Sequence, residues 1–138
     1  KIINFAHAIN YFRDEDKEFA DEAVMDYSPK DFIHYIAGAS FVITDSFHAT
    51  VFSLIFHRPF YTLTRQSADG IKSMNSRVVD LLNTYGLPDR LIDAQEQLFD
   101  GNVNDIDFST FDNMINEQRK KSMTFIKDSL LNRKGGNN

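Results

Sequence analysis

The chain of 138 residues contains no cysteine and no tryptophan, with only three prolines and six glycines. Without thiols it forms neither disulfides nor thiolate metal sites. No apolar run approaches the roughly 20 residues that a membrane-spanning helix needs, and the first residues lack a signal-peptide pattern. We therefore expect a cytoplasmic protein without a transmembrane segment, which could associate peripherally with the inner membrane.

Charge of one sign is not in large excess either, since 15 basic residues stand against 20 acidic ones, for a net charge of −5. A mildly acidic chain gains little from long-range attraction to nucleic acid or an anionic bilayer, so we expect neither as the main partner. The 13 phenylalanines and an apolar share of 42% are enough for one densely packed domain. The chain begins at Lys1 rather than methionine, which suggests a processed protein or part of a longer one.

Helix and strand signals alternate along the chain. Ser28, Pro29 and Asp31 form a helix start, because serine caps free N–H groups, proline suits the first position and a carboxylate favours the positive end. The run over 41–44 is apolar on both faces, as in a central parallel strand, and 48–56 is apolar all round, as in a buried helix. The expected elements are strands over 1–7, 41–44 and 60–63, helices over 29–37, 48–56, 76–85 and 108–131, a loop or exposed helix over 13–22, a loop over 64–75 and a frayed tail over 135–138. This order predicts an α/β fold, a Rossmann-like parallel sheet flanked by helices.

The turn after the strand over 41–44 is the best candidate for a binding site. In open α/β sheets, ligands bind where the carboxyl ends of strands lead into helices, and a helix start offers free N–H groups and a partial positive charge. Ser46 and Thr50 add hydroxyl groups, and His48 adds a group that titrates near neutral pH. The residues alone leave a second interpretation equally open, in which Asp45 or Ser46 simply caps the helix and His48 is a satisfied core imidazole.

Three stretches of the sequence resemble the polysaccharide pyruvyl transferase family. They are Ser28-Pro-Lys-Asp-Phe-Ile, then Ala39-Ser-Phe-Val-Ile-Thr-Asp-Ser-Phe-His-Ala-Thr-Val-Phe-Ser-Leu-Ile-Phe with Arg58-Pro-Phe, and lastly Asn75-Ser-Arg-Val-Val-Asp-Leu-Leu with Gly86-Leu-Pro-Asp-Arg. The hallmark of that family is a strand ending in Thr-(Asp/Asn)-Ser-Phe-His-Gly-Thr, an apolar helix with Phe-Ser, then a basic residue, proline and phenylalanine. The likeness spans about residues 28–90. In one departure, Ala49 replaces the usual glycine, and its methyl group could weaken ligand binding or narrow the substrate range.

The resemblance implies an enzyme that transfers the enolpyruvyl carbons of phosphoenolpyruvate to two sugar hydroxyls of a cell-surface polysaccharide or its precursor. A pyruvate ketal forms and phosphate leaves, with phosphoenolpyruvate as donor substrate and neither cofactor nor metal. The acceptor would be a sugar or glycan, which could be lipid-linked, and the process would belong to exopolysaccharide biosynthesis.

The same resemblance implies two Rossmann-like domains facing across a cleft, as in the GT-B glycosyltransferases. Residues 1–138 would form the C-terminal domain, with a partly irregular lead-in over 1–27, the family core over 28–90, a long C-terminal helix over 107–132 and a frayed tail over 133–138. The missing N-terminal domain would complete the cleft. We therefore expect weak donor binding and no turnover from this chain alone.

His48 has the central role in our hypothesis, as the catalytic residue that either transfers a proton or makes a charged hydrogen bond to phosphate or carboxylate. The candidate substrate-binding residues are Asp45, Ser46, Phe47, Ala49, Thr50, Asn75 and Arg77. Arginine pairs with carboxylate and phosphate through two parallel hydrogen bonds, but a solvated side chain at a helix start explains Arg77 equally well. For Arg65 and Lys72 the solvated interpretation is preferred.

Two competing functions stay open. A nucleotide-sugar glycosyltransferase of the GT-B type would bind a diphosphate at the same helix start. The other alternative is a non-catalytic interaction domain, since Ala49 already departs from the family pattern.

Overall fold

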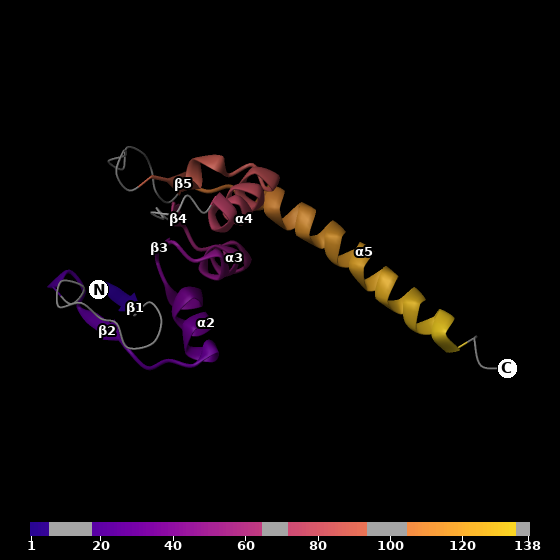
Figure 1. Ribbon diagram of the computed structural model, residues 1–138, viewed down its shortest axis with the longest axis horizontal. Coiled ribbons are helices and arrows are strands. Elements are labelled where there is room, and N and C mark those ends of the chain that lie inside the picture. The colour runs from indigo at the N-terminus through magenta and orange to yellow at the C-terminus, as the bar shows by residue number, and fades with distance from the viewer. Residues whose placement is uncertain (6–17, 65–71, 94–104, 135–138) are drawn as a thin grey trace. The chain divides into compact units, whose positions relative to one another are not determined.

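The computed structural model describes residues 1–5, 18–64, 72–93 and 105–134, of which 72–75 and 132–134 are described by their backbone alone (Figure 1). The chain divides into two compact units, Lys1–Gly38 and Ala39–Asn138. Each combines parallel strands with flanking helices, so the predicted α/β class is confirmed. The tail predicted as frayed over 135–138 lies outside the described residues.

Two short strands pair in the first unit. β1 (Ile3–Phe5) lies parallel to β2 (Glu22–Val24), with Ile3 opposite Glu22. The strand predicted over 1–7 is confirmed for its central residues. The loop or exposed helix predicted over 13–22 is wrong at its end, because Glu22 opens β2, and a three-residue strand is too short to show a periodic pattern.

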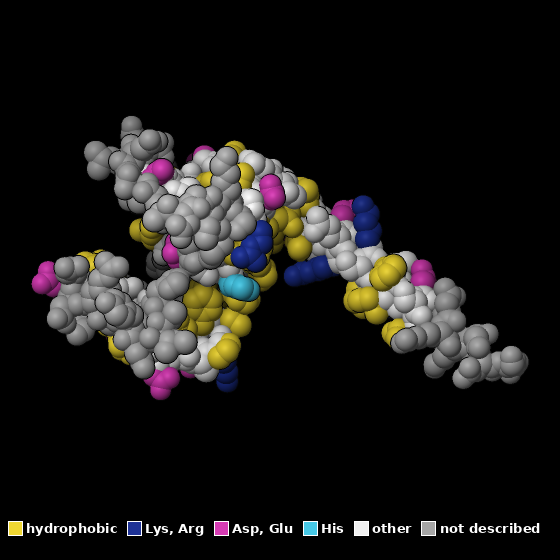
Figure 2. Space-filling model, viewed as in Figure 1, with side chains coloured by type: hydrophobic (Ala, Val, Ile, Leu, Met, Phe, Trp, Pro, Cys, Tyr) yellow, Lys and Arg dark blue, Asp and Glu magenta, His cyan; other side chains and the backbone are white. Residues whose placement is uncertain are grey.

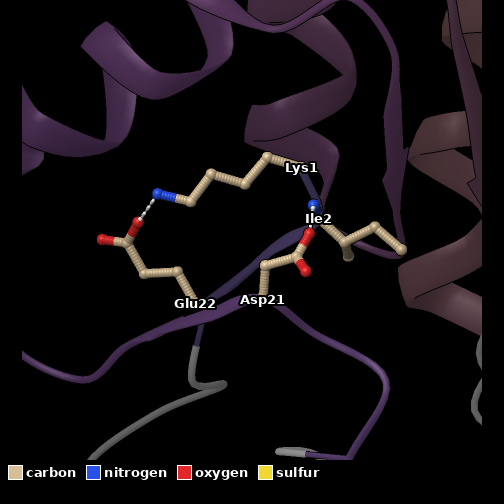
Figure 3. Close-up of polar contacts among 4 residues, drawn as sticks. All are labelled: Lys1, Ile2, Asp21 and Glu22. Atoms are coloured by element: carbon tan, nitrogen blue, oxygen red, sulfur yellow. Dashed lines mark hydrogen bonds and ion pairs between the residues drawn. The ribbon is translucent and has the colours of Figure 1, made fainter.

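Polar contacts join the starts of these two strands (Figure 3). The Lys1 ammonium pairs with the Glu22 carboxylate, and the Ile2 N–H donates to Asp21 Oδ2 at 2.6 Å. The hydrogen bond to Glu22 is the main reason why the pKa of Lys1 is raised above its ordinary value. These contacts fix the register of the pair.

Helix α2 (Pro29–Gly38) begins at Pro29, as predicted, and Ser28 and Asp31 form a reciprocal capping box there. The Asp31 N–H donates to Ser28 Oγ at 3.2 Å, while the hydroxyl and the N–H of Ser28 donate to Asp31 Oδ2 at 2.6 and 2.9 Å. The hydroxyl first, and then the N–H, hold the pKa of Asp31 below its ordinary value of 3.8. The helix start is therefore specified by two residues three positions apart.

Aromatic rings pack around Phe5 in the first unit. Its ring centroid lies 4.9 Å from Tyr27, 5.1 Å from Tyr35 and 5.9 Å from Phe32, each nearly perpendicular to it. Edge-to-face pairs of this kind contribute about 0.5–1.5 kcal/mol each beyond the burial of their surface. They connect β1 to α2, whose Ile36 is also buried.

Three parallel strands form the sheet of the second unit, in the order β3 (Val42–Thr44), β4 (Phe60–Leu63) and β5 (Leu91–Ile92). β4 lies in the middle, and its Phe60 is fully buried. The prediction of β3 as a central strand is wrong within this sheet, because β3 lies at its edge and Ile43 is 56% exposed. The apolar residues of a strand do not show whether one or two strands pair with it. The sequence therefore could not tell whether β3 lies at the centre or at the edge of the sheet.

The described helices of the second unit are α3 (Phe47–Ile55), α4 (Lys72–Thr84), the 3-10 turn η1 (Pro88–Arg90) and α5 (Ser109–Lys134). The predicted helix after β3 is confirmed, but it is not buried all round, since Ile55 is 40% exposed. α4 starts one turn before the predicted Ser76 cap, so the loop predicted over 64–75 is wrong for its last residues. Gly86, with φ +72°, ends α4 as predicted.

The core of the second unit lies where α3, α4 and the start of α5 meet the sheet. It consists of Leu54, Phe60, Val78, Leu82, Tyr85, Leu87 and Phe111. Each large apolar side chain buried there contributes about 1.5–3 kcal/mol. α5 joins this core only through its first turns, because every described residue from Asn116 to Leu131 is exposed.

Candidate functional site

The start of α3 lies directly after the edge strand β3. Ser46 is its N-cap, with φ −90° and ψ 123°, and its Oγ accepts a long hydrogen bond of 3.5 Å from the Ala49 N–H. The first intrahelical bond follows at Thr50, whose N–H donates to Ser46 O at 3.0 Å. The N–H groups of Phe47 and His48 therefore precede the intrahelical ladder, at the positive end of the helix dipole.

Two threonines anchor this turn from inside. Thr50 Oγ1 donates to Ser46 O at 3.0 Å and lies 2.8 Å from Thr62 Oγ1 in β4, and both threonines are completely buried. The Ser46 N–H also donates to Thr44 Oγ1 at 3.0 Å. The hydroxyl of Thr50 thus ties α3 to β4 and has no open direction toward a ligand.

The methyl group that distinguishes Ala49 from the family's glycine points inward. Ala49 is 3% exposed, and its carbonyl accepts from Ser53 Oγ at 2.8 Å. Its side chain is therefore part of the packing of α3. The backbone at this position is already engaged with the cap and with Ser53.

His48 and Arg77 approach the same aromatic ring from two helices. The His48 imidazole is exposed and stands edge-on to the Phe47 ring, with centroids 5.9 Å apart. The Arg77 guanidinium, from α4, lies over the Phe47 ring with Cζ 5.3 Å from its centroid. Phe47 itself packs against the core. One titratable group and one permanent cation are thus gathered at the start of α3.

An open hollow of about 290 Å³ lies beside this ring. Its lining consists of Phe47, Arg77, Asp80, Leu81, Thr84 and Tyr85. The volume is at the lower end of the roughly 300–1,000 Å³ that small-molecule sites occupy. The lining brings the Arg77 guanidinium and the Asp80 carboxylate to one small, open hollow.

The other residues singled out from the sequence lie near the start of α3, on α4, at the other end of α3, or outside the described residues. Asp45 is half-buried, directly before the cap. Asn75 lies in the first turns of α4, and its side chain is not described, while Arg65 lies outside the described residues. Arg58, the basic residue of the family motif, lies at the other end of α3, where its Nη1 donates to Ala39 O at 3.5 Å.

Sequence reasoning missed four residues that shape the site. Thr62 holds Thr50, and its signal is a hydroxyl inside the apolar run of β4. Asp80, Thr84 and Tyr85 line the hollow, and their signal is the helical spacing from Arg77. The packing of α4 against α3 brings that face beside Phe47.

Two kinds of feature are absent from the ranges 1–5, 18–64, 72–93 and 105–134. None of the helices there is long and apolar enough to cross a membrane. These ranges also hold no group of three or more histidine, aspartate or glutamate side chains arranged to bind a metal ion.

Comparison with known proteins gives one match. Residues 2–67 match the model of the polysaccharide pyruvyl transferase family. Searches of curated proteins and of solved structures found no match. The matched segment includes β1, β2, α2, β3, α3 and β4 and stops before Arg77, so the family likeness of 75–90 stays a prediction. This segment, which contains the whole Thr44–Thr50 turn, is therefore similar to the polysaccharide pyruvyl transferase family.

Proposed function

We propose that this chain forms the donor-binding part of a pyruvyl transferase that uses phosphoenolpyruvate and a sugar acceptor. The supporting observation is the pairing of an exposed His48 with Arg77 around Phe47, at the capped start of α3. His48 and Phe47 lie within the segment that matches the family. A helix start and an arginine together favour a small, multiply charged anion.

The reaction has a definite proton balance. The methylene carbon of phosphoenolpyruvate gains a proton and becomes a methyl group, while the oxygen of one sugar hydroxyl bonds to carbon 2 and loses its proton. The second hydroxyl then bonds to the same carbon, the carbon–oxygen bond to phosphate breaks, and the released proton and inorganic phosphate leave. The product is a cyclic ketal, and no oxidant or reductant takes part.

Hydrogen-bond donors at the start of α3 and on α4 hold the anionic groups of phosphoenolpyruvate. The N–H groups of Phe47 and His48 and the hydroxyl proton of Ser46 meet one anionic group at the helix start. The Ser46 hydroxyl is available as a donor because its oxygen only accepts from Ala49. Arg77 meets the second anionic group. Thr50 and Ala49 support the turn from inside, Asp45 lies directly before it, and Asn75 is assigned to donor binding from the first turn of α4.

His48 is assigned the proton transfer. Arg77 keeps its proton at any physiological pH, so it supplies charge but cannot act as an acid or base. Imidazole is the kind of side chain that most often transfers protons in general acid–base catalysis. General acid–base groups of this kind typically contribute about 100- to 10,000-fold to turnover.

The rest of the cleft is assigned to a second, N-terminal domain in a GT-B-like arrangement. The hollow beside Phe47 is open and small, and the acceptor glycan needs contacts beyond it. The acceptor, a cell-surface polysaccharide or its precursor, would meet the donor from that second domain. The chain alone should therefore bind the donor weakly and should not turn it over.

Donor binding tests the site on the chain itself. Titration of phosphoenolpyruvate by calorimetry should show weak binding that Arg77→Gln abolishes. His48→Gln keeps a hydrogen-bond donor and should bind nearly normally. His34→Ala is the matched control, because His34 is exposed on α2 and lies in the other unit. If the Arg77→Gln variant binds phosphoenolpyruvate as tightly as the wild type, the donor site does not lie at this position.

Turnover tests the role of His48 in a protein that joins this chain to its N-terminal domain. Both His48→Ala and His48→Gln should lower phosphate release in the presence of acceptor by at least about 100-fold. Turnover of His48→Gln near the wild-type level would show that a hydrogen bond suffices and would refute proton transfer. Displacement of phosphoenolpyruvate by a nucleotide sugar would favour the glycosyltransferase alternative instead.

A further inference from the structure

The second half of α5 has a different charge from the rest of the chain. Residues 105–118 hold four acidic and no basic side chains, whereas 119–131 hold four basic ones and a single acidic one, Asp128. The whole chain has a net charge of −5. Basic residues near a helix C-terminus complement the dipole only within the last turn. Arg119, Lys120 and Lys121 lie in the middle of α5, so the dipole does not account for them.

The same half of the helix exposes large apolar side chains. Met123, Phe125, Ile126, Leu130 and Leu131 are 51%, 73%, 48%, 61% and 68% exposed. Single exposed apolar residues are ordinary, but five within nine positions of one helix form a group. Figure 2 shows yellow and dark blue side chains together along this part of α5, with no other element covering them in that view.

The apolar and charged residues are ordered around the helix axis. Arg119, Met123, Ile126 and Leu130 follow one another at spacings of four, three and four, and so lie along one face. Glu117, Lys121, Thr124 and Asp128 repeat those spacings from a start two residues earlier. Two residues turn a helix by about 200°, so this second line lies on nearly the opposite face.

Two lysines adjoin the apolar line on one side, and the acidic residues lie away from it. Lys120 lies three residues before Met123, and Lys127 lies between Met123 and Leu130 at spacings of four and three, so both adjoin the line. Both carboxylates, Glu117 and Asp128, are on the far face. Lysine stems can lie along an apolar surface while their ammonium groups reach outward.

We propose that residues 119–131 of α5 form a docking surface for an anionic lipid bilayer. An interfacial helix of this kind buries its apolar side at the boundary between headgroups and acyl chains, and its lysines and arginines contact the anionic headgroups. A second copy of the chain fits less well, because pairing two such faces would bring their flanking cations together. The net charge of −5 does not reveal this surface, since all the acidic residues except Asp128 lie outside 119–131.

Vesicle sedimentation of the chain tests the proposal with two matched pairs of variants. The chain should sediment with phosphatidylcholine vesicles that contain about 30% phosphatidylglycerol, and not with phosphatidylcholine alone. Lys127→Glu should lower binding roughly fivefold or more, while Lys121→Glu, the same charge change on the far face, should have much less effect. Ile126→Ser should lower binding roughly tenfold, while Phe125→Ser, which lies outside the apolar line, should leave it nearly unchanged.

The outcomes divide clearly. Binding that depends on anionic lipid, weakens with salt and distinguishes both pairs supports the docking surface. Equal losses from Lys121→Glu and Lys127→Glu would show unoriented attraction and overturn it. So would an absence of vesicle binding at low salt, or a concentration-dependent dimer in analytical ultracentrifugation that Ile126→Ser dissociates. Circular dichroism of each variant establishes that α5 is intact.

Discussion

The buried pair of hydroxyls between Thr50 and Thr62 gives a sharp test of how the turn at the start of α3 is held. Thr50 Oγ1 uses its one proton toward Ser46 O, so in the 2.8 Å contact Thr62 must be the donor and Thr50 the acceptor. Both side chains have zero exposure, and a replacement that removes one hydroxyl cannot recruit water from the surface without opening the core.

This geometry makes the two valine substitutions unequal. Thr62→Val removes a donor and leaves Thr50 still bonded to Ser46 O, so the free energy of unfolding should fall by about 0.5–1.5 kcal/mol. Thr50→Val leaves the Thr62 O–H buried without its acceptor, which costs about 1–3 kcal/mol. The double variant removes both polar groups and should cost less than the sum, with a coupling of about 1 kcal/mol.

Urea denaturation of the four proteins, followed by circular dichroism, measures these differences. Unchanged slopes with shifted midpoints would show that stability alone has changed. Additive losses, or a Thr50→Val cost smaller than that of Thr62→Val, would refute the hydrogen-bond assignment. A Thr50→Val protein that keeps its stability but loses phosphoenolpyruvate binding would instead assign the hydroxyl to the ligand.

Two further predictions concern helix ends. His57 has φ +52° at the end of α3, where its N–H and that of Arg58 donate back to Leu54 O and Ser53 O at 3.2 and 2.8 Å. Because glycine adopts this conformation without strain, His57→Gly should be more stable than His57→Ala by about 1 kcal/mol in thermal unfolding. Both variants lose the contact with Asp112, so that contact does not affect the comparison. Equal stability of the two variants would contradict the left-handed conformation of residue 57. For Asp31, whose pKa is lowered chiefly by the Ser28 hydroxyl, the stabilisation is complete above pH 3.8 and is lost as the pH falls through the folded-state value. An NMR titration should place the Asp31 pKa below 3.8, and Ser28→Ala should raise it. If the Asp31 pKa is the same in Ser28→Ala, the hydrogen bonds from Ser28 are not the cause of the lowered pKa.

The sequence by itself determined the features that depend on neighbours along the chain. The starts of α2 and α3 follow from Ser28 and Ser46, because a capping hydroxyl acts on N–H groups within the next turn. The α/β class follows from the order of apolar runs, and the Asp-Ser-Phe-His turn indicated the family that the match over residues 2–67 supports. The strands β2 and β5 were missed because each has only two apolar residues, next to charged ones, and so shows no apolar run.

Only the tertiary structure decided what depends on distant residues. It placed β3 at the edge of its sheet, turned the Thr50 hydroxyl toward Thr62, and packed α4 against α3 so that Arg77 lies over Phe47. It also showed that α5 leaves the core after its first turns, so that an apolar and basic surface stays exposed. Burial and contact arise from elements that pack together after the chain has folded back on itself, and a linear pattern carries no measure of which elements those are.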